Sequence, residues 1–475
     1  MEDCCAVWGN GKGGYDLAVI GAGSAGFSAA ITAAEQGAQV ALIGHGTIGG
    51  TCVNTGCVPS KTMIRAAETL HKAKSASRFR GIEAHAKVTD WRAVMAEKKA
   101  LVEGLRQAKY VDLLPAYNSI AYLEGRARLA DGGVSINGEA IKAGKVIITT
   151  GSSPSLPPID GLADIAYLTS TTALELDYLP ASMIVIGGGV IGCELGQMFA
   201  RMGTKVTILC RSKLLPHAEP EISDALTSYL KAEGIDIVCG AVYKSIRKSA
   251  AICLGYEHNG KHHDLTADEV LVATGRRANS AGFGLEEMGV ELRPNGGVKV
   301  DDQMRTTRKG VYAAGDVTGR DMFVYMAAYG AKIAAQNALN GDNRRYDSTA
   351  MPEVVFTDPQ VAMVGMTEAA AKAQGLAVRI SVLSLDHVPR ALAARDTRGL
   401  IKLVAAANSK RLLGAHILAP EGADAVQTAA LAIKHGMTVD ELGAMVFPYL
   451  TTVEGLKLAA LAFDKNVAKL SCCAG

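Results

Sequence analysis

A glycine-rich turn with the spacing Gly-x-Gly-x-x-Gly occurs twice in this chain, each time directly after a short apolar segment. A helical pattern and a second apolar segment follow each turn, which is the order of strand, turn, helix and strand in a dinucleotide-binding unit. The glycines of such a unit let the main chain turn sharply, approach a pyrophosphate and pack the helix on the strand. The two sets are Gly21, Gly23 and Gly26, and Gly187, Gly189 and Gly192. The pattern predicts an α/β protein with two Rossmann-like domains.

The two units also match at the end of their second strands, where Gly44 and Cys210 lie equally far from the first glycine of their unit. Neither residue is the carboxylate that accepts a ribose hydroxyl in many such units. Arg211 and Lys213 come just after Cys210, and arginine near this position accommodates the 2′-phosphate of NADPH. The second unit is therefore predicted to prefer NADPH over NADH, with a solvated basic turn as the alternative.

Length, composition and charge exclude several classes of protein. With 475 residues the chain is long enough for about three domains, and an apolar content of 49% supports substantial cores. The formal net charge is +2, and its even spread gives no sign of a nucleic-acid surface. The first residues resemble no secretory signal and no apolar run is long enough to span a membrane, so a cytoplasmic protein is expected. Ten cysteines are too few for a disulfide scaffold, which favours catalytic or metal-binding cysteines.

Two cysteines lie close together in the segment GGTCVNTGCVPSK, residues 49–61. An apolar-periodic run predicts a helix that begins at about Cys57 and tolerates Pro59 in its first turn. The positive end of that helix dipole would lower the pKa of the Cys57 thiol and favour the nucleophilic thiolate. Cys52 is expected in a Gly- and Thr-rich loop that folds back towards Cys57. A reversible dithiol/disulfide pair is the favoured interpretation, and two unrelated reduced cysteines are the alternative.

The rest of the chain supplies further strands that close on Thr-Gly turns, one of which leads to Asp316 in the segment AAGDV. From about Met351 the pattern changes to a separate α+β unit. The predicted segments are an N-terminal arm (1–14), a first dinucleotide-binding domain in two parts (15–155 and 277–346), a second such domain (156–276) and a C-terminal unit (347–475). Cys4 and Cys5 in the arm are an incidental pair or a soft-metal site.

Together, the cysteine segment, the paired glycine turns and AAGDV resemble the flavin-dependent pyridine nucleotide-disulfide oxidoreductases, from about Tyr15 to the C-terminus. The resemblance implies FAD on the first unit and AAGDV, NADPH on the second, and a C-terminal dimerisation domain. It also implies a homodimer in which the partner subunit completes each active site. The implied FAD residues are Gly21, Gly23, Gly26, Gly50, Thr51, Lys61, Gly151 and Asp316. The implied NADPH residues are Gly187, Gly189, Gly192, Arg211, Lys213 and Gly275.

One departure from the family is Gly44, because a flavin-binding unit normally presents Glu at this position. Glycine has no side chain that can bond the ribose. Weaker FAD binding is one consequence, and replacement of the missing group by water or by His45 is another. The sequence leaves these alternatives open.

A second departure points to one branch of the family. Disulfide-reducing members carry a His-Pro-Thr-x-x-Glu segment, whereas this chain has Tyr449 in place of the histidine and retains Glu454. A phenol with an ordinary pKa of about 10 is a poor proton shuttle at neutral pH. The adjacent Cys472 and Cys473 near the C-terminus offer two thiolates to a soft metal. These features resemble the mercuric reductases, in which Hg(II) is the substrate.

That branch implies a route for the metal. Hg(II) arrives from a small-thiol complex or a mercury-transport protein and is captured by Cys472 and Cys473 of the partner subunit. It passes by ligand exchange to Cys52, the exchanging thiol, and Cys57, the thiol nearer the flavin, and leaves as Hg(0). The branch also implies two tyrosines that line the metal site, Tyr110 and Tyr449, and an ion pair beside the flavin between Lys61 and Glu194. The remaining thiols are expected to be buried and inert, namely Cys193, Cys210, Cys239 and Cys253.

Two other functions remain as alternatives. A thioredoxin-reductase-like enzyme with a C-terminal dithiol would use the same cofactors, but it should retain the histidine that Tyr449 replaces. A non-enzymatic protein that sequesters soft metals gains some support from Gly44. The two intact glycine turns argue against it.

Overall fold

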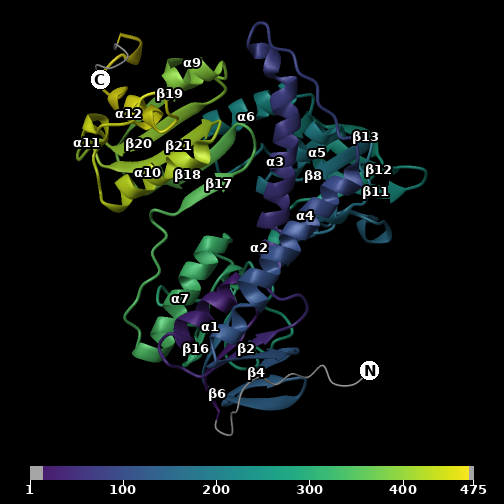
Figure 1. Cartoon of the computed structure of the whole chain (residues 1–475), viewed down its shortest axis with the longest axis vertical. Coiled ribbons are helices and arrows are strands. Elements are labelled where there is room, and N and C mark those ends of the chain that lie inside the picture. Colours follow the sequence, from purple (N-terminus) through teal and green to yellow (C-terminus); the bar gives the residue numbers. More distant parts are fainter. Residues whose placement is uncertain (1–13, 470–475) are drawn as a thin grey trace. The chain divides into compact units, whose positions relative to one another are not determined.

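The computed structural model describes residues 14–469, which form two compact units (Figure 1). The first unit contains residues 14–62, 92–155 and 275–347, and the second contains residues 63–91, 156–274 and 348–469. The predicted α/β fold class with a C-terminal α+β unit is confirmed. The division into predicted segments stays a prediction, and residues 63–91 of segment 15–155 belong to the second unit.

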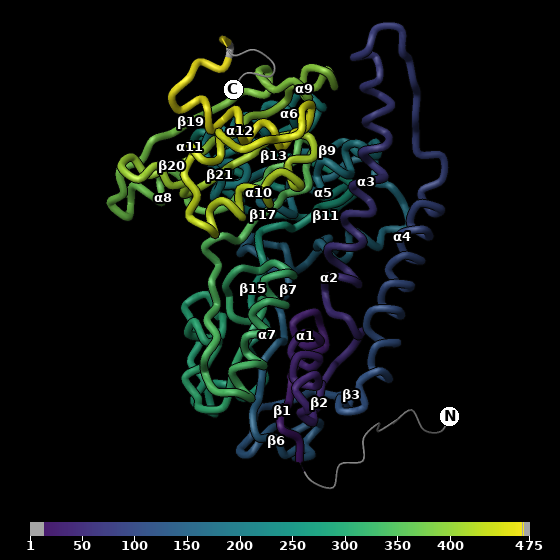
Figure 2. Tube along the Cα trace, turned by 60° about the vertical axis from the view of Figure 1, so that its left-hand side comes forward, coloured from purple at the N-terminus to yellow at the C-terminus, as the bar shows by residue number. Residues whose placement is uncertain are grey.

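The first unit is built on a seven-stranded sheet in the order β3-β2-β1-β6-β5-β4, with β16 paired to β6. Strands β3, β2, β1, β6 and β16 are parallel to one another. Strands β4 and β5 are antiparallel to their neighbours. Helices α1 and α7 pack against each other beside this sheet (Figures 1 and 2). The bounds are β1 Tyr15–Ile20, α1 Ser24–Ala34, β2 Val40–Gly44, β3 Ile120–Glu124, β4 Ala127–Ala130, β5 Gly133–Ile136, β6 Glu139–Ile148, β16 Val311–Ala313 and α7 Val324–Asn340.

Buried apolar residues of β1 and β2 form the centre of this sheet. Leu17 to Val19 of β1 and Val40 to Leu42 of β2 have no exposed surface, as expected of parallel strands covered on both faces. The register pairs Leu17 with Val40 and Ile20 with Ile43, so the carboxyl ends of β1 and β2 lie side by side. Nucleotides bind at that end of such sheets.

The second unit contains another parallel sheet, in the order β10-β9-β8-β14, and an antiparallel sheet of β11, β12 and β13. Helix α5 follows β8, as α1 follows β1 in the first unit. The bounds are β8 Ser182–Ile186, α5 Val190–Met202, β9 Lys205–Cys210, α6 Pro220–Ala232, β10 Asp236–Cys239, β11 Val242–Lys248, β12 Ile252–His258, β13 Lys261–Ala267 and β14 Glu269–Val272. The predicted duplication of the dinucleotide-binding pattern is therefore present in the fold.

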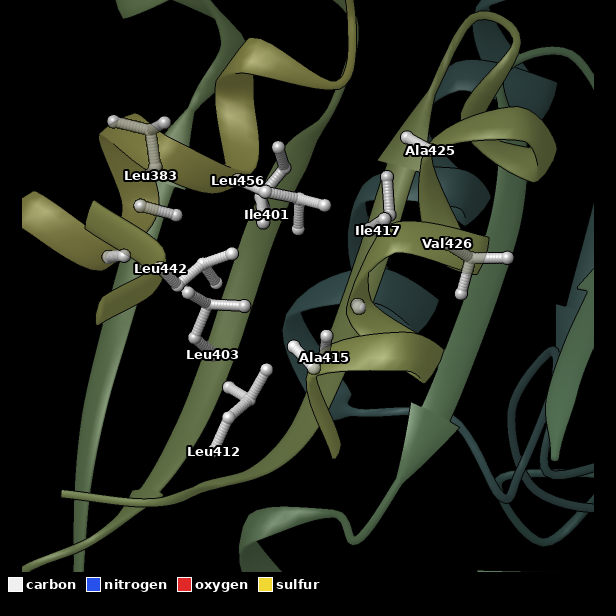
Figure 3. Close-up of a cluster of buried hydrophobic side chains, with 14 of the residues drawn as sticks. Leu383, Ile401, Leu403, Leu412, Ala415, Ile417, Ala425, Val426, Leu442 and Leu456 are labelled. Atoms are coloured by element: carbon white, nitrogen blue, oxygen red, sulfur yellow. The ribbon is translucent and has the colours of Figure 1, made fainter. Parts of the chain in front are cut away.

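A five-stranded antiparallel sheet, in the order β17-β18-β21-β20-β19, forms the C-terminal part of the second unit. Figure 3 shows its apolar core, in which side chains of β19, β20 and β21 meet those of α10, α11 and α12. The bounds are β17 Pro352–Val355, β18 Gln360–Gly365, α8 Glu368–Ala373, β19 Val378–Ser384, α9 Pro389–Ala394, β20 Leu400–Ala406, β21 Leu412–Ala419, α10 Gly422–Lys434, α11 Val439–Ala444 and α12 Glu454–Leu461.

The opposite face of this sheet carries a buried lysine. Lys402 alternates with the core residues Ile401 and Leu403, so its side chain points away from the core of Figure 3. Its Nζ lies 2.9 to 3.0 Å from carboxylate oxygens of three glutamates, and its side chain is 1% exposed. The glutamates are Glu219 and Glu221 at the start of α6 and Glu368 at the start of α8. This ionic cluster joins the C-terminal sheet to the dinucleotide-binding part of the second unit.

Within residues 14–469, no helix has both the length and the apolar character needed to cross a lipid bilayer.

Candidate active site

The cysteine segment forms two successive helices, α2 (Gly50–Thr55) and α3 (Cys57–Lys74). The predicted start of a helix at Cys57 is confirmed, but the expectation that Cys52 lies in a loop is wrong, because Cys52 is in α2. The side-chain amide of Asn54 stabilises this short helix by donating to the carbonyl oxygens of Ile48 at 2.8 Å and Gly50 at 2.9 Å. A polar side chain that satisfies carbonyls of the preceding turn is a local effect that composition alone does not reveal.

The two thiols of the segment interact directly. A hydrogen bond to Cys57 and partial burial raise the pKa of Cys52, while the positive charge of Lys61 acts in the opposite direction. Cys57, at the amino end of α3, is the sulfur that the helix dipole favours as thiolate.

Tyr110 lies beside this pair in the short helix Gln107–Val111. Its ring meets Phe27 edge to face at a centroid distance of 4.9 Å, and its hydroxyl is 3.2 Å from the Ser24 hydroxyl. Burial raises the pKa of Tyr110, and negative charge on Cys52 or Cys57 adds to the shift. The predicted proximity of Tyr110 to the cysteines is present in the structure, and its role in metal transfer stays a prediction.

The residues of the first glycine turn fit the pyrophosphate of FAD. The N-cap of α1 is Gly23, which provides no side-chain cap, and the first turn carries no acidic residue, so its main-chain N–H groups are available to an anion. A Cβ on Gly50 would lie only 2.6 Å from the Gly23 Cα. The Gly49 N–H also donates to the Ala22 carbonyl at 2.9 Å. These contacts place α2, with Cys52, directly against the predicted pyrophosphate-binding turn.

Asp316 lies near the same helix, because a Cβ on the preceding Gly315 would be 3.2 Å from the Ala25 Cβ. Its carboxylate accepts a hydrogen bond of 2.6 Å from the Ser152 hydroxyl. The Arg276 guanidinium in turn donates to the Ser152 hydroxyl at 2.8 Å and to the Ser152 carbonyl at 2.7 Å. Sequence reasoning named Asp316 but missed Ser152 and Arg276, which lie far from it in the sequence.

Two predicted glycines flank this network. Gly151 accepts from the Asn279 N–H at 2.9 Å, and Gly275 accepts from the Ser155 N–H at 2.9 Å. Gly275, predicted for NADPH, is assigned to the first unit. Thr51 is exposed on α2.

The second glycine turn repeats the geometry of the first. Gly187 has a φ of 119° and Gly21 has a φ of 118°, and each allows the close approach of a neighbouring carbonyl. Helix α5 has Gly189 as its N-cap, without a side-chain cap or an early acidic residue. At the end of β9, Arg211 is exposed, while Lys213 donates to the Ala218 carbonyl at 3.5 Å. A cation and an open helix amino terminus therefore fit the 2′-phosphate and pyrophosphate of NADPH.

The other thiols lie mostly in the interior, as predicted. Cys193, Cys210 and Cys253 are buried, whereas Cys239 is only half-buried. Burial and a hydrogen bond with Cys239 raise the pKa of Cys210 to about 12. The Sγ atoms of Cys210 and Cys239 are 3.5 Å apart on neighbouring strands.

The predicted ion pair of Lys61 and Glu194 stays a prediction. Lys61 is in α3, where its charge acts on the Cys52 thiol. Glu194 is in α5, is 4% exposed, and accepts a hydrogen bond of 2.8 Å from the Phe356 N–H. Lys61 belongs to the first unit and Glu194 to the second.

Tyr449 lies in the turn that precedes α12, and Glu454 is the first residue of that helix. The Leu450 N–H donates to a Glu454 carboxylate oxygen at 3.2 Å, and the Glu454 N–H donates to the Thr451 hydroxyl at 3.3 Å. Burial raises the pKa of Glu454. Tyr449 is 46% exposed. Cys472 and Cys473, like Cys4 and Cys5, lie outside the described residues.

Within the part of the chain that the structure describes, no three His, Cys, Asp or Glu side chains are grouped closely enough to hold a metal ion.

Comparison with known proteins identifies the family. Residues 15–332 match the family described as pyridine nucleotide-disulphide oxidoreductase, and residues 351–460 match its dimerisation domain. The relatives named mercuric reductase include one from Lysinibacillus sphaericus, 46% identical over 97% of this chain and 85% of the relative. Another, from Streptomyces lividans, is 45% identical over 97% of this chain and 99% of the relative. A third, from Shigella flexneri, is 47% identical over 98% of this chain and 83% of the relative.

A solved structure with the same fold is the HOCl-induced flavoprotein disulfide reductase RclA from Escherichia coli. It superposes with a TM-score of 0.82 at 30% identity, over 94% of this chain and 99% of that chain. The predicted resemblance to mercuric reductases is confirmed, and the cofactors of this oxidoreductase are FAD and NADPH. The chain belongs to the pyridine nucleotide-disulphide oxidoreductase family.

Proposed function

We propose that this enzyme reduces Hg(II) to Hg(0) with electrons from NADPH, through FAD and the Cys52–Cys57 pair. The observation that carries the proposal is the dithiol itself: one sulfur lies at the amino end of α3, and the helix of the other packs on the glycine turn that fits FAD. When bound, FAD accepts a hydride from NADPH and supplies two electrons to the cysteine pair or to the metal that the pair holds.

The first task of the residues is capture of the metal. In our proposal Hg(II) reaches the pair bound to Cys472 and Cys473 of the partner subunit. Cys52, the exchanging thiol, displaces one of these sulfurs and transfers its proton to that leaving thiolate. The Cys57 thiolate then displaces the second sulfur, so Hg(II) ends with Cys52 and Cys57 as its ligands. The position of Cys57 at the amino end of α3 supports its action as a thiolate.

Reduction follows while the metal is held by both sulfurs. Two electrons convert Hg(II) to Hg(0), which has little affinity for thiolates and leaves, and the two cysteines remain reduced. Lys61 lies where its positive charge favours the thiolate form of the pair. We propose that Lys61 and Glu194 form an ion pair beside the flavin and that Tyr110 contacts the metal during transfer.

Delivery is the second part of the proposal. We infer that Cys472 and Cys473 of the partner subunit take Hg(II) from a small-thiol complex or a mercury-transport protein, in the cytoplasm, and pass it on by ligand exchange. Each sulfur must be displaced by another, since a tightly held metal would dissociate unaided too slowly. The match of residues 351–460 to a dimerisation domain supports a homodimer in which this transfer takes place.

Tyr449 supports mercury over a disulfide as the substrate. Disulfide reduction needs an acid that protonates a departing thiolate, and a phenol is too weak an acid for this role at neutral pH. By the family resemblance, Tyr449 and Glu454 stand at the positions of its acid–base pair, and Glu454 accepts a hydrogen bond from the Leu450 N–H beside Tyr449. The similarity to a flavoprotein disulfide reductase favours the second candidate, reduction of a disulfide.

An assay of competing substrates separates these functions. The purified holoenzyme is given NADPH without oxygen, and either Hg(II) with excess small thiol or one of three disulfides: glutathione disulfide, lipoamide and oxidised thioredoxin. We expect NADPH oxidation with Hg(II), little with the disulfides, and loss of the mercury reaction in Cys52→Ser. Cys253→Ser, a change at a buried thiol of the second unit, is the matched control and should retain it. Turnover of a disulfide with mercury acting only as an inhibitor would contradict the proposal.

A further inference from the structure

Gly44, the residue that departs from the family pattern, lies under a tyrosine of the neighbouring strand. A Cβ on Gly44 would collide with the Tyr122 hydroxyl oxygen and would lie 2.9 Å from the ring atoms Cε2 and Cζ. The phenol therefore occupies the space that a side chain at residue 44 would fill. The absence of a side chain at Gly44 and the presence of Tyr122 are two parts of one arrangement.

The strand register explains why the two residues meet. Strands β2 and β3 are parallel, and Leu42 pairs with Tyr122 while Gly44 pairs with Glu124. Residues at these positions lie on one face of the sheet, because side chains alternate along a strand. Tyr122 is long enough to reach the next residue pair, at the carboxyl end of β2, where the ribose of a bound dinucleotide lies.

The hydroxyl of Tyr122 is available to a ligand. Within residues 14–469 it makes no hydrogen bond to the main chain or to another side chain, although its ring is partly buried. Burial, followed by the negative charge of Glu124, raises its pKa, so the phenol stays neutral and can both donate and accept at physiological pH. His45, the other candidate at this strand end, is exposed.

We propose that Tyr122 binds the adenosine ribose of FAD through its hydroxyl and so replaces the side chain that Gly44 lacks. The binding group comes from β3 in place of β2, and Gly44 must remain glycine to make room for it. This inference depends on FAD as the cofactor and not on mercury as the substrate.

The first test removes only the hydroxyl. FAD is released from the holoenzyme and rebound, and its dissociation constant is measured from the change in flavin fluorescence. We expect Tyr122→Phe to bind FAD about tenfold more weakly, the effect of one lost hydrogen bond. Tyr15→Phe makes the same change at the amino end of β1 in the same sheet and should leave the affinity unchanged. Equal affinity of Tyr122→Phe and the unaltered enzyme would overturn the proposal.

A change in the ligand distinguishes direct contact from a structural effect. With an FAD analogue whose adenosine lacks the 2′- and 3′-hydroxyls, Tyr122→Phe and the unaltered enzyme should bind equally well. A loss of the same size with both ligands would show that Tyr122 acts only on the fold and would refute the contact.

The second test restores the family arrangement. Gly44→Glu alone should weaken FAD binding, since the new side chain collides with Tyr122. Adding Tyr122→Ala removes the obstacle and should recover affinity relative to Gly44→Glu. Normal FAD binding by the single Gly44→Glu variant would show that Tyr122 does not occupy this space.

Discussion

At the scale of single residues, two positions set this chain apart from the family pattern, Tyr449 and Gly44. Both departures can be seen in the sequence, but only one of their consequences can be deduced from it. The consequence at Tyr449 follows from the chemistry of the phenol alone. The consequence at Gly44 depends on Tyr122 of another strand, so only the structure reveals it.

Restoring the histidine tests the role of Tyr449. We expect Tyr449→His to raise turnover with glutathione disulfide by roughly tenfold, below the factor of about 10²–10⁴ that an optimised acid–base group supplies. The gain should be largest near the imidazole pKa of about 6.5 and absent in Tyr449→Phe. Equal disulfide turnover by the two variants would mean that proton supply at this position does not limit the reaction.

The interaction between Cys52 and Cys57 should control how the reactivity of the Cys52 thiol depends on pH. A hydrogen bond to Cys57 is the largest contribution to the raised pKa of Cys52. In NADPH-reduced Cys57→Ser, the pKa of Cys52 should fall, so its alkylation by iodoacetamide should begin at lower pH than in the unaltered enzyme. Mass spectrometry of the alkylated peptide measures this. An unchanged pH profile would assign the raised pKa to burial alone.

At the scale of elements, the contact between α2 and the first glycine turn positions the cysteines. Only some features of this contact could be predicted from the sequence. The glycines and the start of α3 follow from spacing and helix signals. The position of Cys52 in α2 did not follow from them, and there the Asn54 side-chain amide donates to two carbonyls. Ser152 and Arg276 were missed for a different reason, because their hydrogen bonds join strands far apart in the sequence.

Gly50→Ala tests the α2 contact. Gly50 has a φ of 68°, and an added Cβ would be 2.6 Å from the Gly23 Cα, so we expect loss of bound FAD and of mercury turnover. Gly46→Ala is the matched control, because Gly46 has a φ of 80° and nothing within 4 Å of its added Cβ. That variant should show only the backbone cost of about 1–2 kcal/mol and keep its flavin. Equal flavin loss in both variants would exclude the collision as the cause.

At the scale of the whole molecule, the sequence predicts the fold class because periodicity and glycine spacing are local signals. The paired Rossmann-like units and the C-terminal α+β unit follow from such signals. The buried cluster around Lys402 does not, since its three glutamates come from the starts of α6 and α8 while the lysine is in β20. Long-range charge pairing of this kind has no periodic signature.

The Lys402 cluster should stabilise the second unit. Lys402→Met leaves buried carboxylates without their cation, which should lower the free energy of unfolding by about 3–5 kcal/mol. Denaturant unfolding measures this free energy. The control is Lys410→Met, which removes an exposed ion pair with Asp440 and should change the free energy of unfolding little. Lys372 and Lys402 lower the pKa of Glu368, and Lys402 lowers that of Glu221 against the effect of burial. The difference should therefore shrink as the pH falls and these groups are protonated. Equal stability of the two variants would contradict this role.

The most direct test of the central claim is the stoichiometry of the metal reaction. The holoenzyme is supplied with a limiting amount of NADPH, without oxygen, together with Hg(II) and excess small thiol, and the volatile mercury is trapped and counted against NADPH consumed. Two electrons per NADPH and two per Hg(II) predict one atom of Hg(0) for each NADPH, with none released by Cys52→Ser. NADPH oxidation without Hg(0) would show that mercury is not the electron acceptor of this enzyme.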